Sequence, residues 1–475
     1  MDSEASGGIN SQVGRLARGG GVLLAVFLVA GASPVSGSAD EPAGALPAPS
    51  TTAPLTLAEA VALAARNNEL SGIATARLDR ARALRRQAYS ALLPDFSFAG
   101  TYTRRSSEVT RIVDDEKIVV QAIDAFSGVA TIETNILDVR AFPVARSATR
   151  NLEAQEHASA EIRRALAFDV ASSFFAILSA ERLREAASRR IEVAQATVSD
   201  ARTRLEAGLA SSNDLTRAEL ELATAQLALT QAQNAVVGSR LSLGYLIAAP
   251  VVDRPLAEPP AEPADSASPE ELERVAQEAR ADLRELTLRA ESLRLLALEP
   301  ELRVIPTLTL RGTYRGTNEA GLSGRERDWN VAALLNWEIF DGGSRYAEGA
   351  ARRAEYREAL LNADALRRRI GLEIRTARTD LATARASLDQ AEVRARVAEQ
   401  NAREVRVRYS EGLATALEQA DATVSAFEAA AELARQRFAL GIAQLSLSRA
   451  LGRWPVAATT PPEPGGAGTP ERLSP

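Results

Sequence analysis

Two long stretches without proline constrain the fold of this chain more than any other feature. No proline occurs between Pro143 and Pro250, or between Pro306 and Pro455. In the second stretch, apolar and small residues recur at alternating spacings of four and three: Ile370, Ile374, Ala377, Leu381, Ala384, Leu388, Ala391, Ala395, Ala398, Ala402, Val405 and Tyr409. A sustained 3.5-residue repeat predicts supercoiled helix pairs. Forty such residues span roughly 60 Å, which is too long for an ordinary globular core.

The same spacing occurs 204 positions earlier, which indicates an internal duplication. The matching positions are Leu166, Val170, Ser173, Ile177, Ala180, Arg184, Ala187, Ile191, Ala194, Val198, Ala201 and Leu205. Only Arg184 clearly interrupts the pattern. Two helix-start signals also match, because Thr56-Leu-Ala-Glu59 and Ser268-Pro-Glu-Glu271 both read as capping boxes. Chance similarity of alanine-rich helices does not explain caps, strands and turns in one order, so we infer two repeats.

Each repeat also contains a predicted pair of β-strands. Phe96, Phe98 and Tyr102 alternate with polar residues in the first repeat, as Leu308, Leu310 and Tyr314 do in the second. Return strands are expected near residues 129–138 and 330–339. Runs of about 9–11 residues with one apolar face suit transmembrane strands around a wet lumen. A half-buried sheet in a soluble protein fits the strands equally well.

Two glycines mark chain reversals in the long helical stretches. Gly208 and Gly412 are each followed by a polar turn and a new helical pattern, over residues 214–246 and 418–451. Glycine suits a helix end that needs a positive φ. Each repeat is therefore predicted to carry one long helical hairpin.

Composition excludes several classes of protein. Among 475 residues there is no cysteine and a single histidine, His157, so thiolate metal sites and multi-histidine sites are excluded. Lys117 is the one lysine, so no phosphate-binding P-loop exists. A net charge of −6 disfavours nucleic-acid binding. We predict no enzymatic activity, no cofactor and no metal site, with His157 on a helix surface.

The first residues read as a secretory signal peptide. Arg15 and Arg18 precede the apolar run Val22 to Ala30, and Gly37-Ser-Ala39 offers small residues for cleavage. The alternative is a membrane anchor, for which this run is short. Beyond residue 39 no run of 18 apolar residues occurs, so any membrane-spanning part of the mature chain is expected to be β-strand.

The ordered, duplicated set of motifs resembles the TolC family of outer-membrane efflux channels. The matching residues are Leu55-Thr-Leu-x-Glu59-Ala-Val61 with Asn67-Asn68, Leu93-Pro94, Phe340-Asp-Gly-Gly343, and the Gly-Leu turns with acidic residues six positions on. The resemblance covers about residues 55–452. It implies an α+β membrane protein with four transmembrane strands per chain, a trimeric 12-stranded barrel, and a long periplasmic α-helical barrel of coiled-coil-like hairpins. Four strands cannot close a barrel alone, which also favours a trimer.

The domain boundaries follow from the repeats. We predict a signal peptide over 1–39, a linker over 40–54, the first repeat over 55–248, a linker over 249–267, the second repeat over 268–452 and a disordered tail over 453–475.

The resemblance implies an exit duct in the outer membrane, with a periplasmic extension. The duct would be a homotrimer in lipid, serving a tripartite efflux or type I secretion system with a periplasmic adaptor protein and an inner-membrane transporter. The alternative is an exported periplasmic coiled-coil scaffold or adaptor without a barrel. Two hairpins and two strand pairs disfavour that alternative.

The resemblance also implies roles for residues at the hairpin tips. Tyr409 matches the pore-closing tyrosine of the family, and Asp214 matches its acidic partner in the first repeat. Glu418 and Asp421 match a pair of acidic entrance residues, although a solvated helix face is the simpler reading. Ala414 occupies the position of the family's tip arginine, so this chain departs from the family's usual closing network there.

The reversals themselves are the second implied site. In the family, turns equivalent to Gly208-Leu209 and Gly412-Leu413 meet the adaptor protein. A purely structural turn is the alternative.

Overall fold

The computed structural model describes residues 54–113, 116–251, 254–259, 267–319 and 325–455. The predicted signal peptide, nearly all of the first linker and most of the predicted tail lie outside these residues. The first repeat contains α1 (Leu57–Asn67), α2 (Glu69–Ser90), β1 (Asp95–Arg104), β2 (Val109–Val113), β3 (Glu116–Gln121), β4 (Asp124–Leu137), α3 (Ala141–Glu206) and α4 (Ser212–Ile247).

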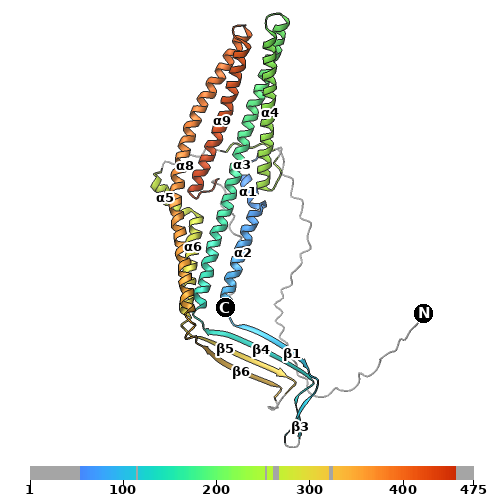
Figure 1. Cartoon of the computed structure of the whole chain (residues 1–475), viewed down its shortest axis with the longest axis vertical. Helices are drawn as coiled ribbons and strands as arrows, with labels where there is room; N and C mark the ends of the chain where they lie inside the picture. Colours follow the sequence, from blue (N-terminus) through green and yellow to red (C-terminus); the bar gives the residue numbers. More distant parts are fainter. Residues whose placement is uncertain (1–53, 114–115, 252–253, 260–266, 320–324, 456–475) are drawn as a thin grey trace, which may run out of the picture. The chain divides into compact units, whose positions relative to one another are not determined.

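The second repeat has the same order of elements apart from one short helix and one insertion. It contains α5 (Pro269–Ala279), α6 (Ala281–Leu296), α7 (Glu299–Leu302), β5 (Thr307–Thr317), β6 (Arg327–Asn336), α8 (Ser344–Ser410) and α9 (Ala416–Ala450) (Figure 1). The insertion is in the first repeat, where β2 and β3 follow β1 in the sequence and form a separate two-stranded ribbon before β4 begins.

The four remaining strands form one antiparallel sheet in the order β1-β4-β5-β6. The two repeats therefore meet along β4 and β5, with Ala130 opposite Tyr314. β1 and β6 are the edge strands, and neither pairs with a second strand among the described residues. Strand β4 begins at Asp124, five residues before the expected return strand, because its pairing with β1 continues to Arg104.

The sheet does not contribute to a buried core among the described residues. The side chains of Phe96 on β1 and Trp329 on β6 are 72% and 71% exposed. The described buried clusters contain residues of helices and their flanking segments, and none from the four strands. In a half-buried sheet of a soluble protein, the apolar face packs against the core. The exposed apolar residues of this sheet therefore favour the membrane interpretation.

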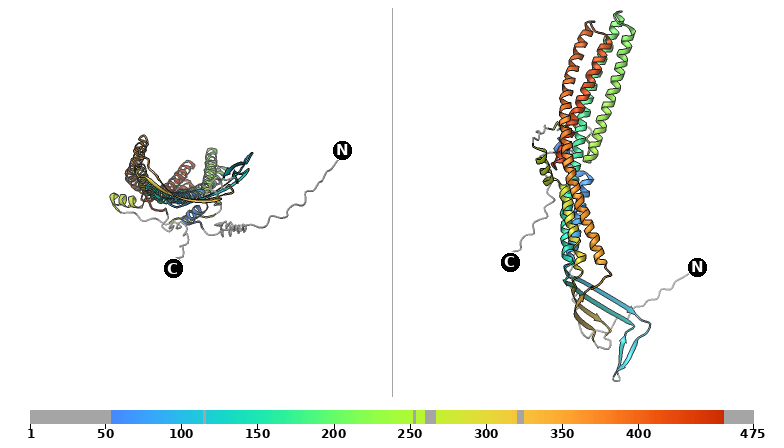
Figure 2. Two further views of the ribbon diagram at one scale, coloured as in Figure 1. Left: turned by 90° about the horizontal axis from the view of Figure 1, so that it is seen from below. Right: turned by 60° about the vertical axis from the view of Figure 1, so that its left-hand side comes forward.

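The long helices confirm the prediction from the 3.5-residue repeat. α3 has 66 residues and α8 has 67, or roughly 100 Å each. Their repeat positions are largely buried against α4 and α9 respectively, and Arg184 is exposed where the pattern breaks. The two hairpins lie side by side through contacts between α3 and α9, giving the lateral order α8-α9-α3-α4 (Figures 1 and 2).

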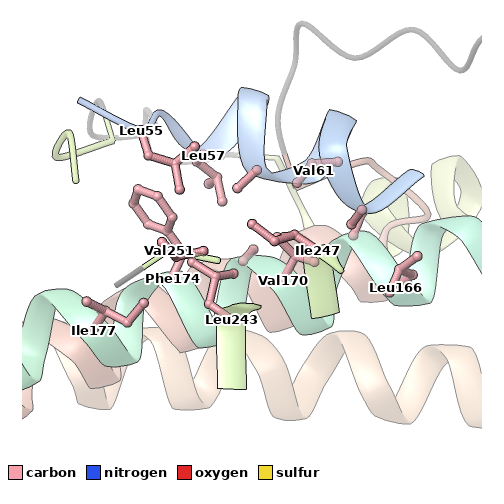
Figure 3. Packing of buried hydrophobic residues seen from close by; sticks show 14 residues of the cluster. Leu55, Leu57, Val61, Leu166, Val170, Phe174, Ile177, Leu243, Ile247 and Val251 are labelled. Atoms are coloured by element: carbon pink, nitrogen blue, oxygen red, sulfur yellow. The ribbon is translucent and has the colours of Figure 1, made fainter. Parts of the chain in front are cut away.

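Each hairpin is fixed at its base by a buried cluster that includes a short helix. In the first repeat, Phe174 of α3 is fully buried, and its ring extends toward Leu55 next to α1 (Figure 3). In the second repeat, Leu272 of α5 packs with Ile370 and Ile374 of α8. The duplication therefore extends to the core.

The predicted capping boxes at the short helices are only half formed. Thr56 accepts the backbone N–H of Glu59 at 3.2 Å, as predicted. The carboxylate of Glu59 does not return to Thr56 and instead accepts two hydrogen bonds from Arg254, at 2.8 and 2.7 Å. Charge-assisted bonding to a guanidinium outcompetes a return to one backbone amide.

Among the described residues, no helix is long and apolar enough to cross a membrane.

Candidate functional site at the hairpin tips

Both hairpins reverse through the same backbone motif. Gly208 has a φ of +71°, and its N–H donates to the carbonyl of Leu205 at 2.9 Å. The N–H of Leu209 donates to the carbonyl of Arg204 at 2.8 Å. These two bonds define a Schellman motif, which satisfies carbonyls at the end of a helix. The second tip repeats the motif with Gly412 at +78° and with bonds from Gly412 to Tyr409 and from Leu413 to Arg408.

The helices that follow the reversals begin with complete capping boxes. Ser211 and Asp214 exchange hydrogen bonds at the start of α4, and Thr415 and Glu418 do so at the start of α9. The Glu418 carboxylate accepts the N–H of Thr415 at 2.7 Å. This backbone bond, with the Thr415 hydroxyl, lowers the pKa of Glu418 below its ordinary value. Asp214 and Glu418 therefore stabilise the first turns of α4 and α9.

Asp421 lies one helical turn beyond Glu418 on α9. Both side chains are exposed, and residues three apart share one face of a helix. Asp421 has no side-chain hydrogen bond or ion pair with any residue in the described part of the chain. The pair therefore presents two carboxylates to solvent from one hairpin.

Tyr409 lies in the last turn of α8 and is only 4% exposed, and Arg204 of the other hairpin covers it. The Arg204 guanidinium lies 4.6 Å from the centroid of the Tyr409 ring. The same guanidinium donates to the carbonyls of Tyr409 and Ser410, at 2.6 and 2.8 Å. Burial raises the pKa of Tyr409, and Arg204 opposes that shift. One arginine of α3 thus holds the C-terminal end of α8.

The contact made by Arg204 was not predicted from the sequence. Arg204 was visible only as a repeat partner of Arg408, four residues before its glycine. Which helix end its side chain reaches depends on how two hairpins lie together, and no local pattern encodes that. Below the tips, a second link also escaped prediction: buried Gln419 of α9 donates to the Thr197 hydroxyl of α3 at 3.0 Å.

The two tip leucines are exposed. Leu209 and Leu413 have 80% and 65% of their surface accessible. An apolar residue is common at this position of a Schellman motif. The exposure of both leucines leaves them accessible to a partner. The eight predicted site residues thus gather at two neighbouring tips at one end of the hairpin pair (Figure 1). Their roles in an aperture and in adaptor contact stay predictions.

His157 lies half-buried on α3, where burial and then Arg284 lower its pKa. No group of three His, Cys, Asp or Glu side chains that could hold a metal occurs in the part of the chain that the structure describes.

A family model described as outer membrane efflux protein matches residues 61–249 and 272–453. The chain belongs to the outer membrane efflux protein family. The two matched segments correspond to the two structural repeats. The resemblance inferred from the motifs is thereby confirmed, and the alternative of a scaffold or adaptor protein is not supported.

Solved structures show the same fold. The CmeC outer membrane channel of Campylobacter jejuni is 17% identical, with a TM-score of 0.72 over 83% of this chain and 85% of that one. VceC, an outer membrane protein of Vibrio cholerae, is 20% identical, with a TM-score of 0.70 over 84% and 96%. The open-state MtrE outer membrane channel of Neisseria gonorrhoeae is 17% identical, with a TM-score of 0.71 over 84% and 89%. No curated protein matches the chain.

Family membership gives the protein its place and task. It is an outer-membrane exit duct of an efflux system, and its helical hairpins form the periplasmic extension. The sheet and the tips at opposite ends of α3 and α8 are the membrane part and the periplasmic end of this duct (Figure 1).

Proposed function

We propose that three copies of this chain form the complete duct, which receives substrates from an inner-membrane transporter through a periplasmic adaptor. The observation that carries the proposal is that the sheet and the row of long helices both have outer edges with no partner in the described part of the chain. The duct transports without catalysis, so no residue is assigned to a chemical step.

The sheet supplies the first argument for a trimer. The outer edges of β1 and β6 leave rows of backbone N–H and C=O groups that pair with no strand in the described part of the chain. Such groups cannot face lipid, because no water is there to satisfy them. Pairing β6 of one copy with β1 of the next keeps the antiparallel alternation, and three copies give twelve strands.

The helical layer supplies a second, independent argument. Its outer helices, α4 and α8, each expose an apolar stripe that no helix in the described part of the chain covers. On α4, Leu220, Leu227 and Leu241 are exposed at multiples of seven residues. On α8, the exposed apolar residues include Leu361, Leu372, Val393, Val397 and Val407. Packing α8 of one copy against α4 of the next buries both stripes by a head-to-tail interface, which closes into a ring.

Glu418 and Asp421 would then line the periplasmic aperture as six carboxylates around one axis. Clustered carboxylates focus a negative potential that favours cations. The hydrogen bonds from the Thr415 backbone and hydroxyl lower the pKa of Glu418 and so favour its charged form. Leu209 and Leu413, each exposed directly after its turn glycine, would meet the adaptor.

Mass measurement and conductance together test this function. The mature chain, extracted in detergent, is expected to have the mass of a trimer and to give cation-selective channels in planar bilayers. A monomer that is stable in water without detergent and forms no channel would refute the proposal. Co-purification with a membrane-anchored adaptor encoded beside it would identify the transport system.

A further inference from the structure

The internal duplication places a second arginine where the first repeat has Arg204. Arg204 and Arg408 occupy the same position, four residues before Gly208 and Gly412, and both carbonyls accept the leucine N–H of their Schellman motif. Arg204 caps the neighbouring helix end. Arg408 is exposed and has no side-chain hydrogen bond or ion pair with any described residue, although its charge lowers the pKa of Glu418.

The neighbour that Arg408 would need lies in another copy of the chain. Arg204 reaches from α3 to α8 within one chain. If the trimer proposed above forms, the helix next to α8 on its open side belongs to the following copy. That helix is α4, so the neighbouring tip is the tip of the α3–α4 hairpin. By the repeat relation, the end of α3 in that copy lies relative to Arg408 as the end of α8 lies relative to Arg204 within one chain. The positions equivalent to Tyr409 and Ser410 are Leu205 and Glu206.

We propose that Arg408 caps the C-terminal end of α3 of the adjacent copy, through the carbonyls of Leu205 and Glu206. The inference rests on the proposed trimer. A ring of six arginine contacts results, three within chains and three between chains. The C-terminal end of a helix carries a partial negative charge, so a guanidinium is a suitable ligand for the end of α8 and for the end of α3.

The two kinds of contact differ in one respect. Within the chain, the guanidinium also lies over the Tyr409 ring. Between chains, Leu205 takes the place of that tyrosine, so the cation–π contribution is missing. The contacts between chains are therefore the weaker half of the ring. The hairpins of one chain should move together, and the aperture should widen where chains meet.

The absence of cysteine from the natural sequence allows a direct test by cross-linking. One double variant carries Arg408→Cys with Glu206→Cys. The control double variant carries Arg204→Cys with Ser410→Cys, whose residues are in contact within the chain. Bifunctional maleimides of increasing length are tried until one links the control pair. That link lies within one chain, so it gives cross-linked peptides without joining two chains.

With that reagent, the Arg408 and Glu206 variant should yield covalent dimers and trimers on a denaturing gel. If the native mass is that of a trimer but the reagent joins no chains, the contact between chains is refuted while the proposed function stands. If the native mass is that of a monomer, the proposed function and this inference fail together.

Conductance supplies a readout that does not depend on cross-linking. Arg408→Ala should raise the resting conductance on the order of tenfold, since three charged contacts are lost at once. Arg408→Lys should retain most of the closure, because it keeps the charge. Arg403→Ala is the matched control, since Arg403 is exposed on the same helix. Equal conductance of the Arg408→Ala and Arg403→Ala channels would refute the inference.

Discussion

Replacing Arg204 with alanine should loosen the two hairpin tips of one chain from each other. The substitution removes two hydrogen bonds to the carbonyls of Tyr409 and Ser410 and the guanidinium over the Tyr409 ring. A cation at a helix C-terminus is worth about 0.3–1 kcal/mol when it is partly exposed. The cation–π contact adds about 0.5–1 kcal/mol. We therefore expect a loss of about 1–2 kcal/mol per chain.

A double-mutant cycle of Arg204→Ala, Tyr409→Leu and the double variant separates the contribution of the ring from that of the two hydrogen bonds. Tyr409→Leu installs the residue found at the equivalent position of the first repeat and should remove only the part due to the ring. Tyr409→Phe should behave as the parent, because the Tyr409 hydroxyl has no hydrogen bond to any described residue. Resting conductance and thermal unfolding of the detergent-extracted protein are the measurements. The reasoning is refuted if Arg204→Ala changes neither, or if Tyr409→Phe is as damaging as Tyr409→Leu.

Three further predictions concern the tips and the core. Gly412→Val should cost about 1–2 kcal/mol because of the positive φ alone, since an added Cβ meets no atom within 4 Å. It should abolish export without dissociating the protein, and export at parental levels would contradict this. Gly412→Asn should be tolerated. Replacing Glu418 and Asp421 together with alanine should reduce cation preference in bilayers, whereas unchanged selectivity would leave them as a solvated helix face. Phe174→Ala should lower the stability of the protein by about 3–5 kcal/mol, as measured by thermal unfolding. A smaller loss of stability than that caused by Phe96→Ala, at an exposed position, would contradict the buried position of Phe174.

Periodic features of the fold were predictable, and contacts between distant segments were not. The spacing from Ile370 to Tyr409 revealed a buried helical seam, and Arg184 marked its interruption, because helix periodicity is a local property. The partner of Glu59 is Arg254, 195 positions away, and no local signal indicates it. The ribbon of β2 and β3 has no counterpart in the second repeat, so the duplication gives no signal for it.

The candidate site shows the same division. The glycine reversals were predictable because a positive φ at a helix end strongly selects glycine. Asp214 and Glu418 were singled out by resemblance, and the structure adds that each completes a capping box. The signal for that was present in Ser211 and Thr415, three residues before each acid. Arg204 was missed because its partner lies on another hairpin.

The unpaired edges have a consequence for biogenesis. A single copy displays two open strand edges and two apolar helix stripes at once, and such surfaces invite pairing with any exposed strand. Folding and association should therefore be one event, with a melting temperature that rises with protein concentration. Newly exported copies would depend on holding chaperones until neighbours arrive. Copies that find none should be the preferred substrates of periplasmic proteases, which would match the amount of duct to the rate of assembly.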